Sequence, residues 1–205
     1  MRKSAAVLAV LVFAVIAVCV AGCSSTPRVT RVSDNAVTDI SGRWNDTDSR
    51  QVAEKIVGDC LQAPWLNEWM SANANKRPVV IVGTIVNKSH EHINTETFIN
   101  DIQRYLVNSG KVEFVANKGE RQELRSETAD QAANAAVDSR QVAGEESGAD
   151  LMLLGSINSI VDQEGGKAVV FYQINLELVQ IETHKKVWIG DKKIKKFVEN
   201  SSTKF

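Results

Sequence analysis

The sequence is poor in the residues that define several specialised classes of protein. Three prolines and twelve glycines among 205 residues exclude collagen-like and proline-rich repeats. Three cysteines are too few for a disulfide scaffold. Neither sign of charge dominates, because 24 basic residues face 25 acidic ones, so a dedicated nucleic-acid-binding protein is not expected. The hydrophobic content of 43% is that of an ordinary folded domain, with room for at most a tether beside it.

The N-terminus has the pattern of a secretory signal. Arg2 and Lys3 give a positive start, and residues 5–20 form an uncharged, largely apolar run. The run ends in Val20-Ala21-Gly22-Cys23, which resembles the lipobox of bacterial lipoproteins. The alternative is an uncleaved anchor helix, because the run approaches the length that spans a bilayer. We expect residues 1–22 to be a lipoprotein signal peptide.

The lipobox resemblance implies a lipid anchor at Cys23. Its thiol would carry a thioether-linked diacylglycerol, and further acyl chains such as palmitate would make the anchoring stable. In lipoproteins of double-membraned bacteria, an Asp after the lipidated cysteine tends to retain the protein at the inner membrane. Ser24 stands there instead. This implies the periplasmic face of the outer membrane.

The same assignment accounts for the other two cysteines. Cys19 leaves with the signal peptide, so Cys60 is the one cysteine of the mature chain with a free thiol. No intramolecular disulfide is then possible. Cys60 continues the apolar helical stripe of Val52 and Ile56, which predicts a small buried core residue rather than a reactive thiol.

Residues 23–47 are predicted to be the lipidated N-terminus and a flexible tether, because residues 24–47 are polar and show no apolar periodicity. The remaining residues, 48–205, are predicted to form a single globular α/β domain. Asp48 or Ser49 would cap its first helix, and Pro64 suits the first turn of a second, short helix.

The next elements follow from periodicity and turn signals. A β-branched run at 79–86 predicts a strand buried on both faces, and Thr95 opens a helix that ends near Asn108. Residues 111–115 alternate as a strand. Residues 118–146 favour helix, broken near Ser126–Thr128.

Three strands complete the expected domain. They cover 151–161, then 168–181 after a turn at 164–167, and a last strand that begins at 187–189. In the central strand Tyr172, Ile174, Leu176 and Leu178 alternate with more polar residues. The order predicts an α+β fold: a mixed sheet with helices packed on it, closing in a C-terminal antiparallel meander.

Motifs for catalysis or cofactor binding are missing from the sequence. It contains no Gly-x-Ser-x-Gly, Ser-x-x-Lys or His-Glu-x-x-His motif. His90-Glu91-His92 could chelate a metal weakly, but no third or fourth ligand is evident nearby. Gly165-Gly166-Lys167 lacks the spacing of a phosphate-binding loop. We therefore expect no enzyme, no cofactor, no metal and no small-molecule substrate.

Two side-chain clusters leave alternatives open. Trp65 and Trp69 share one helical face, which favours core packing, with an exposed partner-binding patch as the alternative. The C-terminal hairpin concentrates six lysines, which would protect an edge strand from aggregation or dock on an acidic partner or anionic lipid. These are Lys185, Lys186, Lys192, Lys193, Lys195 and Lys196.

The order of features across 79–197 resembles the LpoB family. A valine-rich strand ends at Asn87 before a loop and a helix, and N-x-G-K-x-x-x-V follows at 108–115. Gly148-Ala149-Asp150 precedes the next strand, and E-T-x-x-x-V-W stands at 182–188. The pattern also resembles, more loosely, the N-terminal domain of TolB and the periplasmic domain of the curli secretion lipoprotein CsgG.

This resemblance implies an outer-membrane lipoprotein that activates penicillin-binding proteins. It would bind the periplasmic domain of a bifunctional penicillin-binding protein and stimulate peptidoglycan synthesis. The looser resemblance leaves an alternative, an assembly or scaffold lipoprotein of an envelope secretion system. One departure stands out: family members of this kind typically carry a long proline-rich tether, whereas this tether holds only Pro27.

Overall fold

The computed structural model describes residues 29–34, 36–141 and 144–199, and the segment from Val37 onward forms one compact unit. Residues 29–34 belong to a preceding unit and are exposed, without helix or strand. The predicted signal peptide and Cys23 lie outside the described residues. Among the residues that are described, no helix has the length and apolar character needed to cross a membrane.

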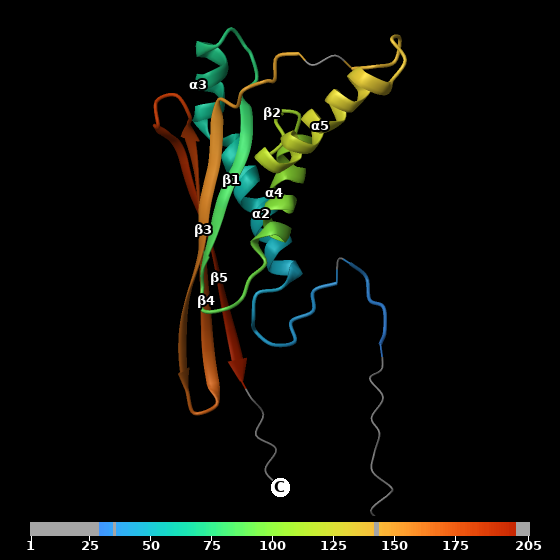
Figure 1. Cartoon of the computed structure of the whole chain (residues 1–205). Coiled ribbons are helices and arrows are strands. Elements are labelled where there is room, and N and C mark those ends of the chain that lie inside the picture. Colours follow the sequence, from blue (N-terminus) through green and yellow to red (C-terminus); the bar gives the residue numbers. More distant parts are fainter. Residues whose placement is uncertain (1–28, 35, 142–143, 200–205) are drawn as a thin grey trace, which may run out of the picture. The chain divides into compact units, whose positions relative to one another are not determined.

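The sheet has five strands in the order β2-β1-β3-β4-β5 (Figure 1). Strand β1 (Val79–Lys88) runs parallel to β2 (Glu113–Phe114) and to β3 (Leu151–Glu164). Strands β3, β4 (Lys167–Gln180) and β5 (Lys186–Glu199) form an antiparallel meander. The predicted mixed sheet with a C-terminal meander is therefore confirmed.

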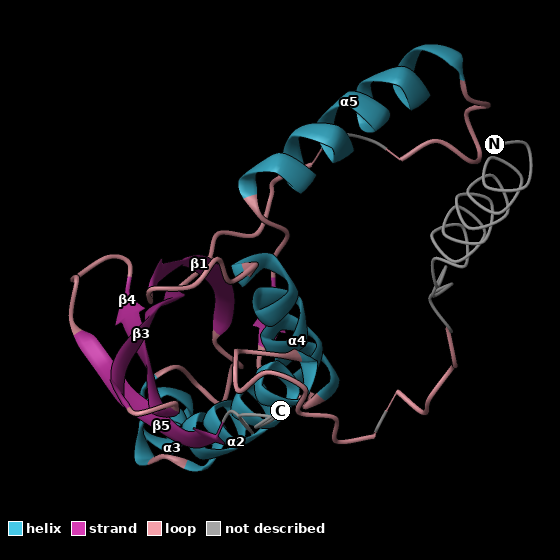
Figure 2. Cartoon of the chain, turned by 90° about the horizontal axis from the view of Figure 1, so that it is seen from below, coloured by secondary structure: helices cyan, strands magenta, loops and turns pink. Residues whose placement is uncertain are grey.

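Helices cover one face of this sheet. Helix α2 (Asp46–Gln62) packs against β5 and against α4 (Thr95–Asn108), which also contacts β1. Figures 1 and 2 show both helices on the same side of the sheet. Helix α3 (Pro64–Ala72) follows α2 directly, with proline in its first turn as predicted. The opposite face of the sheet is called the outer face below.

The core lies between this helical layer and the sheet. The most deeply buried side chains come from α2, α4 and alternate positions of β3 and β4, and include Val52, Ile56, Phe98, Ile102, Leu151, Ile157, Tyr172, Ile174 and Leu176. In β4 every second residue from Val170 to Leu178 is buried, which confirms the predicted alternation. Such alternation is typical of an antiparallel sheet with one covered face.

Two helices differ from the predictions. The N-cap of α2 is Asn45 rather than Asp48 or Ser49, and the Asp48 side chain accepts a hydrogen bond from the backbone of Asn45 in a capping box. Helix α5 (Lys118–Asn134) continues through Ser126–Thr128, where the Thr128 hydroxyl donates to the Leu124 carbonyl one turn earlier. It ends at Asn134, so the prediction of helix up to residue 146 was wrong.

Strand β1 is also less buried than its sequence suggested. Residues 80–82 are buried, but Thr84 and Val86 are exposed. The pairing with β3 shifts register between Val82 and Ile85, and beyond that point the outward-pointing side chains face solvent. Strand β2, in turn, is limited to Glu113–Phe114, shorter than the predicted 111–115.

Candidate functional site

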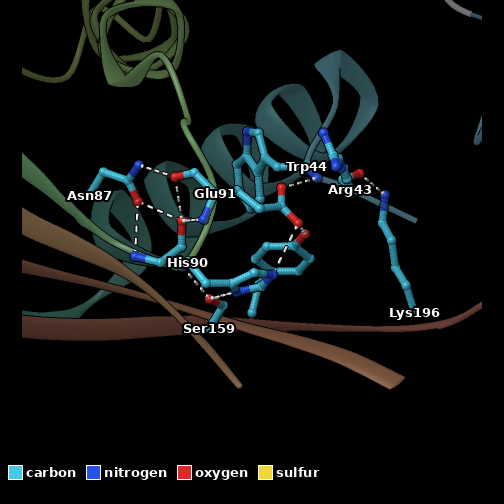
Figure 3. Close-up of polar contacts among 9 residues, drawn as sticks. Arg43, Trp44, Asn87, His90, Glu91, Ser159 and Lys196 are labelled. Carbon is cyan, nitrogen blue, oxygen red and sulfur yellow. Dashed lines mark hydrogen bonds and ion pairs between the residues drawn. The ribbon is translucent and has the colours of Figure 1, made fainter. Parts of the chain in front are cut away.

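A polar network connects the loop after β1, the segment before α2 and one half of the meander (Figure 3). This half lies next to the β3–β4 turn, at the bottom of Figure 1, and is called the lower half of the meander below. The loop is folded by its own side chains. Ser89 donates its backbone N–H to the Asn87 side-chain oxygen (2.9 Å), and Asn87 Nδ2 donates to the Glu91 carbonyl (2.8 Å). This Asx-type turn directs the Glu91 side chain toward the sheet.

The Glu91 carboxylate is the centre of the network. Its Oε1 accepts a hydrogen bond from the Tyr172 hydroxyl (2.6 Å), and its Oε2 accepts one from the Trp44 backbone N–H (3.1 Å). Only 12% of the Glu91 side chain is exposed, so these charge-assisted bonds compensate for its loss of water. Burial, together with the hydrogen bond and charge of Glu91, raises the pKa of the Tyr172 phenol well above its usual value.

Trp44 fixes the same segment by packing. Its ring meets Phe98 edge-on (6.1 Å between centroids, 83°) and Tyr172 at 5.6 Å and 67°. Edge-to-face aromatic pairs of this kind add to the free energy gained from area burial. The backbone bond to Glu91 and these ring contacts hold residues just before α2 against the core.

A second anchor lies on β5. Lys196 donates from Nζ to Asp48 Oδ2 (2.6 Å), to Asp39 Oδ1 (2.7 Å) and to the Arg43 carbonyl (3.0 Å). The side chains of Lys196 and Asp48 are only 10% and 9% exposed. Although burial opposes the charge, the hydrogen bonds and charges of the two aspartates raise the pKa of Lys196. The hydrogen bond from Lys196 lowers the pKa of the more exposed Asp39.

These contacts involve residues from the predicted tether. Residues 23–47 were expected to be flexible, yet Asp39, Arg43 and Trp44 bind β5 and the core. The compact unit from Val37 onward includes these residues. We call residues 39–45, with these contacts, the N-terminal clasp.

The candidate metal cluster is divided among other contacts. The His90 ring Nδ1 lies 2.6 Å from the Ser159 hydroxyl, and Glu91 is bound by Trp44 and Tyr172. His92 is exposed. No group of three His, Cys, Asp or Glu suited to a metal ion occurs within the described part of the chain.

The other singled-out residues have structural roles. Trp65 is buried, with its ring N–H bonded to the Cys60 carbonyl (2.7 Å), and Trp69 packs against the core, which confirms the core interpretation. Cys60 is buried as predicted, and burial raises the pKa of its thiol to about 12. Gly165 and Gly166 form the β3–β4 turn with positive φ angles of 57° and 80°. This confirms the predicted hairpin.

The lysines of the C-terminal hairpin separate into different environments. Strand β5 is indeed an edge strand. Lys186 pairs with Glu177 (2.7 Å), Lys193 pairs with Asp191 (3.2 Å), and Lys196 belongs to the clasp. Lys195 is exposed, and the described residues place no carboxylate within 4.0 Å of its amine.

Sequence reasoning missed Glu91, Trp44 and Lys196 as a connected set. Their partners are far away in the chain: 47 positions separate Trp44 from Glu91, and 148 separate Lys196 from Asp48. The one available signal was Trp44 itself, a large apolar residue in a polar segment just before a helix cap.

Chemically, the groups of this arrangement position one another. Its carboxylates, hydroxyl and ammonium are bonded to one another across elements, and they hold the lower half of the meander rigidly against the clasp. Rigid strands with an uncovered face are suited to binding another macromolecule.

Comparison with protein families and solved structures gives the following similarities. The family model of the peptidoglycan-synthase activator LpoB matches residues 48–194. The C-terminal domain of LpoB from Salmonella enterica is 17% identical, with 75% of this chain and 99% of that one covered and a TM-score of 0.41. The NMR structure of E. coli LpoB is 14% identical, with 83% of each chain covered and a TM-score of 0.41.

Similarity extends to a lipoprotein outside that group. Lipoprotein GNA1162 from Neisseria meningitidis is 15% identical, with 62% of this chain and 88% of that one covered and a TM-score of 0.37. A search of curated proteins gave no match.

The Glu91 network predicts a stability loss in Glu91→Gln. One amide oxygen cannot accept from both Trp44 N–H and Tyr172 O–H on the two sides of the group, so one donor loses its acceptor. We expect the free energy of unfolding to fall by about 1–3 kcal/mol in urea denaturation. Glu123→Gln, on the exposed face of α5, is the control and should change it by less than about 0.5 kcal/mol. Equal stability of the two variants would contradict the role of Glu91.

The Lys196 anchor predicts a pH-dependent effect. Lys196→Met should cost roughly 2–4 kcal/mol at pH 7, because Asp48 is left buried without its cation. The pKa of Asp39 is lowered from its usual value of 3.8. The contribution of the Asp39 ion pair to the free energy of unfolding is therefore present above pH 3.8 and is lost as pH falls through the lowered pKa. The pKa of Lys196 is raised from its usual value of 10.5. The contribution of its charge to the free energy of unfolding is therefore complete below pH 10.5 and is lost as pH rises through the raised pKa.

The penalty of Lys196→Met, measured by urea unfolding from pH 2 to 11, should therefore be largest between these limits and shrink outside them. Lys192→Met serves as a matched control from the same strand. A penalty that stays constant from pH 7 to pH 2 would show that the ion pairs contribute nothing.

Proposed function

Because the chain belongs to the family of peptidoglycan-synthase activators named LpoB, we propose that it binds and activates a bifunctional penicillin-binding protein. The observation that carries this proposal is the family match, which extends over residues 48–194 and so over most of the globular domain. The domain would act from the periplasmic face of the outer membrane, held there by lipid on Cys23. It would itself catalyse no reaction.

The mechanism follows from binding alone. An activator that contacts the synthase more tightly in its active conformation shifts the population toward that conformation. The increase in rate is then limited by the difference between the two affinities. A rigid binding face strengthens association, because less conformational entropy is lost on binding, whereas the shift itself depends on contacts that differ between the two conformations. The clasp and the Glu91 network supply such rigidity in the meander.

The clasp also limits the reach of the domain. Once residues 39–45 are part of the domain, at most residues 23–38 remain between the lipidated cysteine and the fold. Sixteen residues extend over at most about 55 Å even when fully stretched. We therefore propose that the docking domain of the synthase approaches the outer membrane to within this distance.

The lipid anchor gives a prediction of its own. In cells supplied with an alkyne analogue of palmitate, the wild-type chain should be labelled and Cys23→Ala should not, because only a thiol forms the thioether. Cys60→Ala is the control and should be labelled like the wild type, since Cys60 is buried with a raised pKa. Labelling of Cys23→Ala would contradict the anchor assignment.

The activator proposal is tested by recovery and then by rate. The full chain is crosslinked to detergent-solubilised envelope proteins at low and moderate salt, and the recovered proteins are identified. We expect a bifunctional penicillin-binding protein, whose glycan polymerisation rate should rise several-fold when purified chain is added. Recovery of only itself or of secretion components, in a large multimer, would overturn the proposal in favour of the assembly role.

A further inference from the structure

The lower half of the meander presents apolar side chains on the outer face, away from α2 and α4. Ile160 in β3 lies directly opposite Phe171 in β4, and Phe171 lies opposite Lys195 in β5. One row further, Val169 lies opposite Phe197. Cross-strand neighbours have their side chains on the same face, about 5 Å apart. We call Ile160, Phe171, Lys195 and Phe197 the outer patch.

The outer patch is open to solvent. Ile160 is 66% exposed and Phe197 is 63% exposed, whereas Val170 and Tyr172, which point inward from β4, are 7% and 0% exposed. Figure 1 shows this half of β3, β4 and β5 extending past α2 and α4. Large apolar side chains gathered in this way on an exposed sheet face are typical of interaction sites.

The charges beside the patch indicate what it binds. Lys195 lies within it, Lys88 lies in the neighbouring row, opposite Asn158, and the exposed Asp162 lies opposite Val169 in the row of Phe197. Neither ammonium has an acidic partner within 4.0 Å among the described residues, whereas Lys193 and Lys186 are already neutralised by Asp191 and Glu177. Two cations without ion pairs against the one carboxylate of Asp162 leave the apolar centre in a net positive surrounding, which complements a partner with an apolar centre flanked by carboxylates.

Protein fits this surface better than lipid. Anionic membranes are recognised by clusters of four or more basic residues, and two of the lysines on this face are paired with acids. The row next to the patch is polar and uncharged in β3 and β4, where Asn158 lies opposite Gln173. Amides of this kind supply the hydrogen bonds of a protein interface around a central apolar anchor.

We propose that the outer patch docks on an acidic surface with an apolar centre on the periplasmic domain of the synthase. This inference rests on the proposed function and adds the contact face and its chemistry. Strand β5 then serves two purposes through its alternation: Lys196 points inward to the clasp, and Lys195 points outward to the partner.

The chain offers a closely matched pair of variants. Ile160 and Ile189 are both exposed isoleucines on the outer face, 66% and 61% exposed, but Ile189 lies at the opposite end of the meander, opposite Glu177. Because both are exposed, serine should be tolerated at either position, and equal urea midpoints would verify this. Lys195→Glu and Lys185→Glu form a second pair, the latter in the β4–β5 turn.

The test measures the dissociation constant between the full lipidated chain in detergent and the purified synthase, at 50 and 300 mM salt. Ile160→Ser should weaken binding about tenfold, as expected for an interface anchor, and Ile189→Ser less than twofold. Lys195→Glu should weaken binding mainly at low salt, and Lys185→Glu should have little effect. A parallel arm measures sedimentation of the Cys23→Ala chain with anionic phosphatidylglycerol vesicles.

Each outcome of these measurements either supports or overturns the proposed role of the outer patch. Selective losses in Ile160→Ser and Lys195→Glu support the outer patch. Binding that is unchanged in both, or equally weakened by Ile189→Ser, overturns the patch while the activator function stands. Lysine-dependent vesicle binding without loss of synthase binding overturns it in favour of a membrane surface. If the wild-type chain does not bind the synthase, the proposed function fails, and the patch proposal fails with it.

Discussion

The largely buried carboxylate of Glu91 is the interaction on which the lower half of the domain depends. It joins the loop after β1 to the Trp44 backbone before α2 and to the Tyr172 hydroxyl in β4. A carboxylate at this depth is stable only when its oxygens receive donors, and here the donors come from two distant parts of the chain. The polar bond and the Trp44 ring contacts therefore reinforce each other, since the backbone bond holds the segment that carries the ring.

The Lys196 anchor extends this arrangement to the edge of the sheet. By binding Asp39, Asp48 and the Arg43 carbonyl, it ties the strand farthest from β1 to the start of α2. The inner side of the meander is thereby occupied, and the outer side remains uncovered by any described element. In our account this asymmetry converts a long meander into a rigid binding face. It also gives the lysines of β5 more than one role, beyond protection of an exposed edge.

Local patterns in the sequence were sufficient for most of the fold. Helix α4 was predicted from Thr95 to near Asn108 because its apolar spacing and its polar termini agree, and β4 was predicted because Tyr172, Ile174, Leu176 and Leu178 alternate. The clasp could not be predicted in this way. Its bonds join residues up to 157 positions apart, and a polar segment that folds onto a domain has the same composition as one that does not. The uninterrupted course of α5 was missed because threonine is a weak helix former, yet the helix runs through Ser126–Thr128.

Photocrosslinking in cells tests the central claim most directly, because it reports which face of the domain meets the synthase. A photoreactive residue would replace Ile160 on the outer face or, as the comparison, Glu54 on the exposed side of α2, which lies across the sheet. Our account predicts that the synthase is crosslinked from position 160 and not from position 54. Crosslinking from position 54 alone would contradict it, since the helical side of the domain would then be the binding face.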